Sequence, residues 1–307
     1  MSATEVLKVA IEPASRPEFE AAVAAAGGQV VELDSSVRAM IWTDYSKPAE
    51  LDQVIRANPQ LEWVQLPFAG VDAFTKTLQA PVQFTSAKGS YKEPVAEHAL
   101  TLALALARKI PERVRASTWG EKFAVSLYDS EILIVGGGGI TEELLKLLAP
   151  FKTTVRVLRK HVQPMHGATS VEELSALDER LATADFVVLA AALTDETRGL
   201  FDADRFSKMQ STAYLVNIAR GPIVDTPALV SALNDGLIAG AGVDVTDPEP
   251  LPDGHPLWAA KNVIITPHTA DTPVQVIRLF SERIDANVKA FITGQPLIGL
   301  VDPSLGY

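Results

Sequence analysis

The alternation of short apolar runs with helical patterns is the feature that most restricts how this chain can fold. Six runs in its second half, several of them apolar throughout, have the length and the β-branched content of strands: residues 131–136, 154–159, 186–191, 213–218, 241–245 and 262–266. Strands without polar alternation are typical of parallel sheets that are covered by helices on both faces. The pattern predicts a doubly wound α/β sheet in this half.

The first hundred residues repeat this pattern on a smaller scale. Strand-like runs at residues 7–11, 39–43, 62–66 and 83–87 alternate with helical patterns near 17–26 and 48–57. A last helical pattern at 272–292 is followed by too few residues for a further domain, so we expect it to pack on the first one. For 307 residues two domains are the usual number. We therefore expect two Rossmann-like doubly wound parallel-sheet domains, residues 1–97 with 272–307 and residues 98–271.

Composition excludes several classes of function. The net charge of −11, from 27 basic and 38 acidic residues, would repel a nucleic-acid backbone. The absence of cysteine excludes disulfides, thiolate nucleophiles and cysteine metal sites. The most apolar stretch, 96–106, is too short and too close to charges to span a membrane, and the N-terminus does not read as a signal peptide. We expect a cytoplasmic protein without a nucleic-acid or membrane partner.

A run of four glycines, residues 136–139, directly follows one predicted strand and precedes a helical pattern. Gly136 and Gly138 allow a tight turn and a close approach of a pyrophosphate to the amides of the helix N-terminus. Thr141 stands where the dinucleotide fingerprint has its third glycine. The run predicts a dinucleotide site, although a tight structural connection is the alternative reading.

Three further segments carry charged side chains just beyond predicted strands. Arg220 follows the strand at 213–218, Glu249 follows the strand at 241–245, and His268 follows the strand at 262–266. An open α/β sheet presents its ligand crevice at the carboxyl ends of its strands. We therefore expect Arg220, Glu249 and His268 to converge on a ligand, instead of forming surface ion pairs.

Four other segments, together with these, resemble the D-isomer-specific 2-hydroxyacid dehydrogenases over nearly the whole chain. They are LPFAGVD at 66–72, VAEHAL at 95–100, LTDETRGLF at 193–201 and SALNDGLIAGAGVDV at 231–245. The resemblance implies an NAD(P)-dependent oxidoreductase that reduces a 2-keto acid to the D-2-hydroxy acid. The first domain would bind the substrate, the second would bind the dinucleotide, and the active site would occupy the cleft between them.

The resemblance also implies catalytic roles for the three strand-end residues. His268 would be the general acid that protonates the keto oxygen, and Glu249 would fix its tautomer and raise its pKa. Arg220 would hold the substrate carboxylate and stabilise charge on the keto oxygen. Backbone amides of the loop Phe68–Ala69–Gly70 would bind the carboxylate as well.

A wider set of residues is expected to contact the cofactor, either in the glycine loop or at the ends of the strands. These residues are Gly136, Gly138, Gly139, Ile140, Arg159, Lys160, Thr197, Ile218, Ala219, Asp244 and Ala270. Arg159 stands where an NAD site has an acidic residue that binds the ribose, and with Lys160 it offers cations to a 2′-phosphate. We expect a preference for NADP(H), with NAD(H) possible, and no metal.

Some alternatives stay open at this point. Small substrates such as glyoxylate or hydroxypyruvate are favoured over a phosphoglycerate dehydrogenase-like activity, because the chain has no room for a regulatory extension. A catalytically idle, corepressor-like relative is the other alternative. The resemblance implies a homodimer, with the helix at 96–106 and the segment around Trp119 as candidate contacts. His98 and His255 read as structural residues.

Overall fold

The computed structural model describes residues 6–303, which form two compact units. One unit contains the residues up to Tyr91 and those from Thr272 onward, and the other contains Lys92 to Asp271. The first boundary lies six residues before the expected position, because the helix that begins at Lys92 belongs entirely to the second unit. The segment after Thr272 packs on the first unit, as expected. No helix among residues 6–303 is long and apolar enough to cross a bilayer.

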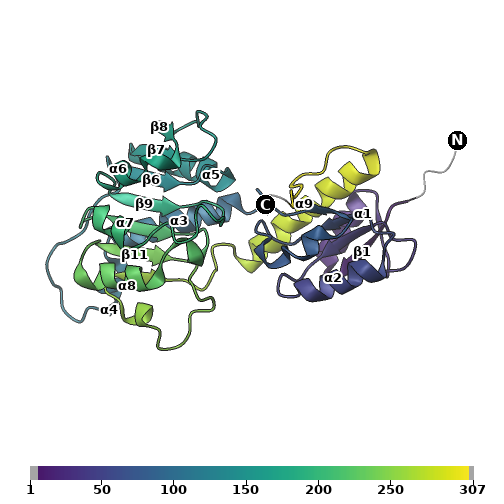
Figure 1. Cartoon of the computed structure of the whole chain (residues 1–307), viewed down its shortest axis with the longest axis horizontal. Helices are drawn as coiled ribbons and strands as arrows, with labels where there is room; N and C mark the ends of the chain where they lie inside the picture. Colours follow the sequence, from purple (N-terminus) through teal and green to yellow (C-terminus); the bar gives the residue numbers. More distant parts are fainter. Residues whose placement is uncertain (1–5, 304–307) are drawn as a thin grey trace. The chain divides into compact units, whose positions relative to one another are not determined.

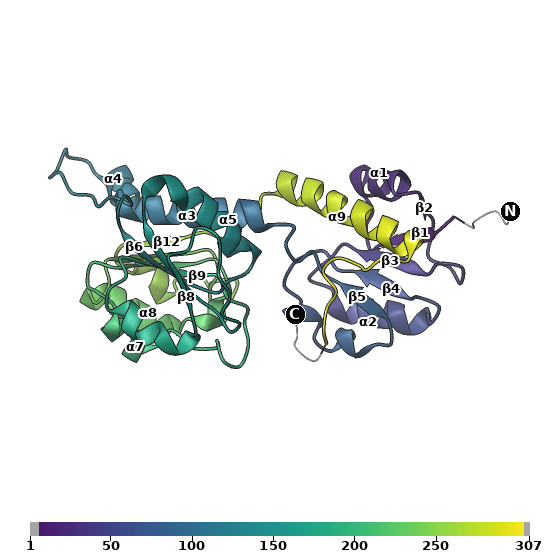
Figure 2. The same ribbon diagram turned by 90° about the horizontal axis from the view of Figure 1, so that it is seen from above.

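The first unit is built on a five-stranded, all-parallel sheet with the order β2-β1-β3-β4-β5. Its strands are β1 (Lys8–Glu12), β2 (Gln29–Val30), β3 (Ala39–Trp42), β4 (Trp63–Gln65) and β5 (Gln83–Thr85). Its helices are α1 (Pro17–Ala25), α2 (Pro48–Ala57) and α9 (Pro273–Thr293). Figure 2 shows α1 and α9 on one face of the sheet and α2 on the other. This is the doubly wound arrangement that the apolar strands predict.

The second unit contains a seven-stranded parallel sheet with the order β12-β11-β10-β9-β6-β7-β8, most of which can be followed in Figure 1. Its strands are β6 (Glu131–Val135), β7 (Thr154–Leu158), β8 (Ser170–Glu172), β9 (Phe186–Leu189), β10 (Tyr214–Asn217), β11 (Gly240–Val243) and β12 (Val263–Ile265). Its helices are α3 (Lys92–Ala107), α4 (Ile110–Arg115), α5 (Gly139–Leu148), α6 (Leu177–Leu181), α7 (Ala203–Lys208) and α8 (Thr226–Asp235). The order reverses between β6 and β9, where a Rossmann sheet binds its ligand.

Alternate residues of the central strands β6, β9 and β10 enter two separate cores. In β6, Ile132 and Ile134 face the core shared with α3 and α5, whereas Leu133 and Val135 face the core shared with α6, α7 and α8. Figure 2 shows α3 and α5 on one side of the sheet and α7 and α8 on the other. Burial on both faces explains why these strands carry no polar alternation.

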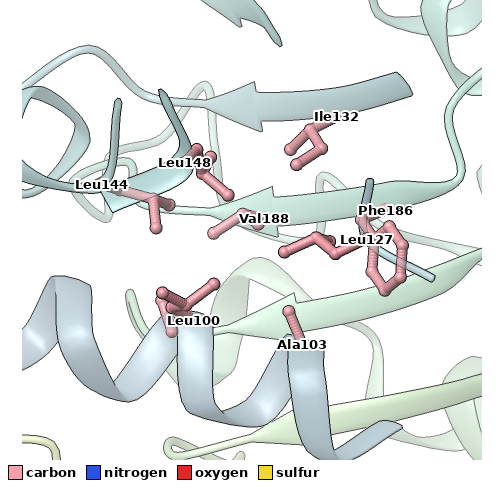
Figure 3. Close-up of a pocket in the computed structure, with 9 residues that line it drawn as sticks. Leu100, Ala103, Leu127, Ile132, Leu144, Leu148, Phe186 and Val188 are labelled. Carbon is pink, nitrogen blue, oxygen red and sulfur yellow. The ribbon is translucent and has the colours of Figure 1, made fainter. Parts of the chain in front are cut away.

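The core beneath α3 and α5 contains one small cavity (Figure 3). It is lined by apolar side chains such as Leu144, Phe186 and Val188, and its volume is about 10 Å³. A space of this size holds no more than one water molecule, and an apolar wall gives that water no hydrogen-bonding partner. The cavity is therefore a packing gap and not a ligand site.

Candidate active site

The turn that carries Arg220 is fixed by contacts of its own backbone. Asn217, the buried last residue of β10, accepts a hydrogen bond from the Ala219 amide at 3.0 Å and donates one to the Arg220 carbonyl at 3.1 Å. A Cβ atom at Gly221 would lie 1.9 Å from the Thr246 carbonyl oxygen. Only glycine allows this close approach. Gly221 therefore fixes the backbone position from which the Arg220 side chain extends.

The loop that carries His268 is attached to the buried carboxylate of Asp244. This carboxylate accepts hydrogen bonds from the Thr266 hydroxyl at 2.6 Å and from the amides of Thr269 and Ala270 at 2.9 and 3.1 Å. His268 itself has a φ of +52°, a left-handed conformation that is uncommon outside glycine and costs conformational energy. The hydrogen bonds to Asp244 offset the conformational energy of His268, and they hold its imidazole in a defined place at the end of β12.

His268 and Glu249 form a direct pair, since His268 Nδ1 lies 2.6 Å from Glu249 Oε1. The hydrogen bond to the Glu249 carboxylate raises the pKa of His268 above its ordinary value, against the opposing effects of burial and the Arg220 charge. The same hydrogen bond lowers the pKa of Glu249. The pair therefore stabilises the imidazolium form of His268, and Nε2 is left to act on a ligand.

Replacing Glu249 by Gln should lower the pKa of His268, because the carboxylate that stabilises the imidazolium is removed. The family resemblance implies a reductase whose acid is this imidazolium, and such an enzyme loses activity as the pH rises through this pKa. In Glu249→Gln that loss should therefore begin at lower pH than in the wild type. The measurement is the pH profile of kcat/KM for reduction. An unchanged profile would contradict the role assigned to Glu249.

Two of the remaining histidines, His98 and His255, make hydrogen bonds that support the structure. His98 Nε2 lies 3.0 Å from the Thr266 hydroxyl and 3.4 Å from the Asp244 carboxylate, so it supports the same loop. His255 Nδ1 accepts a hydrogen bond from the Leu257 amide at 3.2 Å. Both agree with the structural interpretation. Within residues 6–303 no group of three or more suitable side chains could hold a metal ion.

The glycine loop makes a tight turn that leaves part of its backbone open. Gly136 has a φ of +112°, and a Cβ atom there would lie 2.4 Å from the Ala190 carbonyl oxygen. Gly138 faces open space, with no atom within 4 Å of where its Cβ would be, so a phosphate could approach the backbone. Thr141 is fully buried and donates a hydrogen bond to the Gly136 carbonyl at 2.7 Å. The departure from the third glycine is therefore accommodated within the turn.

Acidic side chains follow this loop, and the structure places cations beside one of them. Glu143 Oε1 lies 2.6 Å from Lys92 Nζ and 2.9 Å from Lys146 Nζ. Hydrogen bonds from these two lysines lower the pKa of Glu143. Lys92 also contacts the loop, since its Cδ lies 3.4 Å from where a Gly139 Cβ would be. Its charge offsets the repulsion that Glu143 would exert on a phosphate. The sequence pattern did not single out Lys92.

Arg159 lies against the glycine loop at the carboxyl end of β7. Its Cδ is 2.6 Å from where a Cβ of Gly137 would be, so a larger residue at 137 would displace the Arg159 side chain. In the described part of the chain the Arg159 guanidinium makes no ion pair, whereas Lys160 pairs with Glu196 at 3.2 Å on the surface. Arg159 is therefore the cation available beside the loop.

The other expected cofactor residues lie at the ends of the neighbouring strands. Ile218 and Ala219 are buried in the turn after β10. The Thr197 hydroxyl donates to the Ala192 carbonyl at 2.7 Å in the loop after β9, and Ile140 packs against the core beneath α3. The Asp244 carboxylate already accepts hydrogen bonds from the loop that carries His268. Its role in the structure is therefore to support residues 266–270.

In the first unit, the loop Phe68–Ala69–Gly70 follows β4. The Phe68 carbonyl accepts a hydrogen bond from the Ala87 amide at 2.9 Å, and its ring packs against Tyr45 and Tyr91. Among residues 6–303, the backbone N–H groups of Ala69 and Gly70 have no hydrogen-bond acceptor. These two N–H groups are therefore available to an anion.

A cavity of about 270 Å³ lies beside this loop, within the first unit. Its apolar wall includes Phe19, Phe68, Ile277 and Phe280, and Arg16 lies among its polar residues. It offers space at the carboxyl ends of β1, β3 and β4, which is the edge of the sheet where α/β proteins bind ligands.

Comparison with known proteins identifies the family. Residues 100–270 match the D-isomer specific 2-hydroxyacid dehydrogenase, NAD binding domain. The chain belongs to this family. A glyoxylate reductase from Thermofilum pendens is 33% identical over 81% of this chain and 77% of its own. A glyoxylate reductase/hydroxypyruvate reductase from Mus musculus is 30% identical over 93% of this chain and 87% of its own.

The fold of this 2-hydroxyacid dehydrogenase also matches a solved structure. A D-isomer specific 2-hydroxyacid dehydrogenase from Xanthobacter autotrophicus, in complex with NADPH, is 31% identical and superposes with a TM-score of 0.86. The match covers 98% of this chain and all of that one. The two parallel-sheet α/β domains are thus those of the family.

Proposed function

We propose that this 2-hydroxyacid dehydrogenase reduces a small 2-keto acid, such as glyoxylate or hydroxypyruvate, to the D-2-hydroxy acid. The observation that carries the proposal is the His268–Glu249 pair at 2.6 Å. The charge of Arg220 acts on both members of this pair. A proton donor and a guanidinium at one edge of a Rossmann sheet meet the needs of carbonyl reduction. The named relatives support the choice of substrate.

Each residue of the site has one task in this reaction. The free amides of Ala69 and Gly70 bind the substrate carboxylate, and the guanidinium fork of Arg220 is a second carboxylate-binding group. His268 delivers its Nε2 proton to the keto oxygen, and Arg220 stabilises the charge that forms there. A nicotinamide cofactor, held by the glycine loop, supplies the hydride when it is bound.

The stereochemistry of the product tests this proposal. Hydroxypyruvate and NADPH are incubated with the protein, and the glycerate that forms is separated on a chiral column. The expected product is D-glycerate alone. L-glycerate, or no glycerate, would contradict the proposal.

NADPH is the cofactor that the glycine loop favours, because Arg159 packs against it as a cation without an ion-pair partner. Arg159→Asp should lower the ratio of catalytic efficiency with NADPH to that with NADH by at least about 10-fold, the scale of one lost charge-assisted hydrogen bond. Steady-state kinetics with both cofactors measure the ratio. Lys152→Asp, the same charge change at the exposed amino end of β7, is the control. Equal use of both cofactors by the wild type would contradict the preference.

A homodimer is also proposed, with residues 110–128 as its contact. In the second unit this segment exposes five large apolar side chains, namely Ile110, Val114, Trp119, Phe123 and Tyr128. Trp119 is 92% exposed, and exposed apolar patches mark interaction surfaces. The apolar side of α3 is excluded as a contact, because Leu102 and Leu106 are buried in the core of the unit.

Light scattering should give twice the chain mass of 32.9 kDa. Trp119→Asp should lower that mass towards one chain at micromolar concentration, because a buried charge disfavours an apolar contact. Val274→Asp, at another exposed apolar position, should leave the mass unchanged. A wild-type mass of one chain would contradict the dimer.

A further inference from the structure

Arg283, in the middle of α9, is a buried cation that has no carboxylate partner among residues 6–303. Its exposure is only 8%, and none of the ion pairs among residues 6–303 includes it. Arg278, one and a half turns earlier on the same helix, is exposed and pairs with Glu282 at 2.8 Å. A buried charge without a counter-ion is costly and needs a reason.

In the described part of the chain, the Arg283 guanidinium donates its hydrogen bonds to backbone carbonyls. Nη1 donates to Ser86 at 2.9 Å and to Ile298 at 3.2 Å, and Nη2 donates to Lys88 at 2.8 Å. Burial lowers the pKa of Arg283, but an arginine side chain stays protonated in proteins. Carbonyl oxygens accept three hydrogen bonds from the guanidinium, but as neutral groups they do not balance its positive charge.

The segment that Arg283 holds is bonded in turn to the substrate loop. The Ala87 amide donates to the Phe68 carbonyl at 2.9 Å, and the Tyr91 hydroxyl donates to the Pro67 carbonyl at 2.7 Å. These two carbonyls immediately precede the free amides of Ala69 and Gly70. The guanidinium, residues 86–91 and the anion-binding loop therefore form one hydrogen-bonded set within the first unit.

We propose that Arg283 is a positioning residue for the substrate carboxylate, and that this carboxylate balances its charge. The inference rests on the proposed function, because it requires an anionic substrate on the amides of Ala69 and Gly70. Arg283 does not touch the substrate. It fixes the shape of the loop through Ser86 and Lys88, and its charge makes the loop a better site for an anion.

The test compares Arg283→Met and Arg283→Lys with the control Arg278→Met, using the full-length protein. In Arg283→Met the KM for the 2-keto acid should rise about 10- to 100-fold, the scale of a small misplacement of a binding group. Its kcat should change much less. The Kd for NADPH should stay the same, because the cofactor residues lie in the other unit. Arg283→Lys keeps the charge and should recover most of the KM, whereas Arg278→Met should match the wild type.

Each outcome decides the matter. A folded Arg283→Met with an unchanged KM would overturn the inference, as would a parallel loss of substrate and NADPH binding. If Arg283→Met does not fold, Arg283→Gln replaces it, because a neutral amide can still donate to a backbone carbonyl: a raised KM with unchanged NADPH binding supports the inference, and an unchanged KM contradicts it. A wild-type protein that turns over no 2-keto acid would instead contradict the proposed function.

Discussion

His268→Ala should lower kcat for 2-keto acid reduction by about 100-fold or more while the fold stays intact. Removal of a positioned general acid usually costs this much, and His268 is the proton donor that is hydrogen-bonded to Glu249. Stopped-flow or steady-state assays of NADPH oxidation measure this decrease in kcat. Binding of NADPH should be retained, since the glycine loop follows β6 whereas His268 follows β12.

The matched control is His166→Ala, which removes an exposed imidazole from a loop of the same unit. It should behave as the wild type does. If His268→Ala kept more than about a tenth of the wild-type kcat, a loss far below the general-acid scale, the proton would have to come from another group.

Arg220→Ala should lower kcat/KM still further, by about 1000-fold. One lost donor to a developing oxyanion costs about 100- to 1000-fold in rate, and the variant also loses a partner of the substrate carboxylate. Both KM and kcat should therefore suffer. Arg220→Lys should recover only part of the loss, because an ammonium group cannot offer the planar fork.

Arg56→Ala is the control for this variant. Arg56 is an exposed arginine of α2 whose ion pair is with Asp52 on the same helix, so its removal should leave the kinetics unchanged. An Arg220→Ala protein with a raised KM but the wild-type kcat would show that Arg220 binds the substrate without assisting the reaction.

The strands that build the site could be predicted from the sequence because they are buried on both faces. β9 is apolar along its whole length, β6 and β10 each have one polar residue at an end, and each of the three strands ends within two residues of its predicted position. β2 and β8 were missed. They have two and three residues, and neither contains a fully buried position. Such edge strands carry no hydrophobic period, so only pairing with a neighbour defines them.

The placement of Arg220, Glu249 and His268 followed from their positions just after strands of one sheet. The importance of Lys92 and Arg283 could not be predicted in this way. Arg283 and Arg278 look alike in the sequence, and Arg283 is distinguished only by contacts with residues almost 200 positions away. Thr141 shows the opposite case: the sequence marks a departure from the fingerprint, but only the structure shows that its hydroxyl completes the turn.

The most direct test of the central claim is turnover by the purified wild-type protein. Glyoxylate, hydroxypyruvate, pyruvate and bulkier 2-keto acids are each supplied with NADPH and with NADH, and the loss of reduced nicotinamide absorbance is followed. The bulkier acids belong in the panel because the cavity beside Phe68 leaves space for a side chain. We expect rapid oxidation of NADPH with glyoxylate or hydroxypyruvate. A protein that binds NADPH but oxidises neither cofactor with any of these acids would contradict the account.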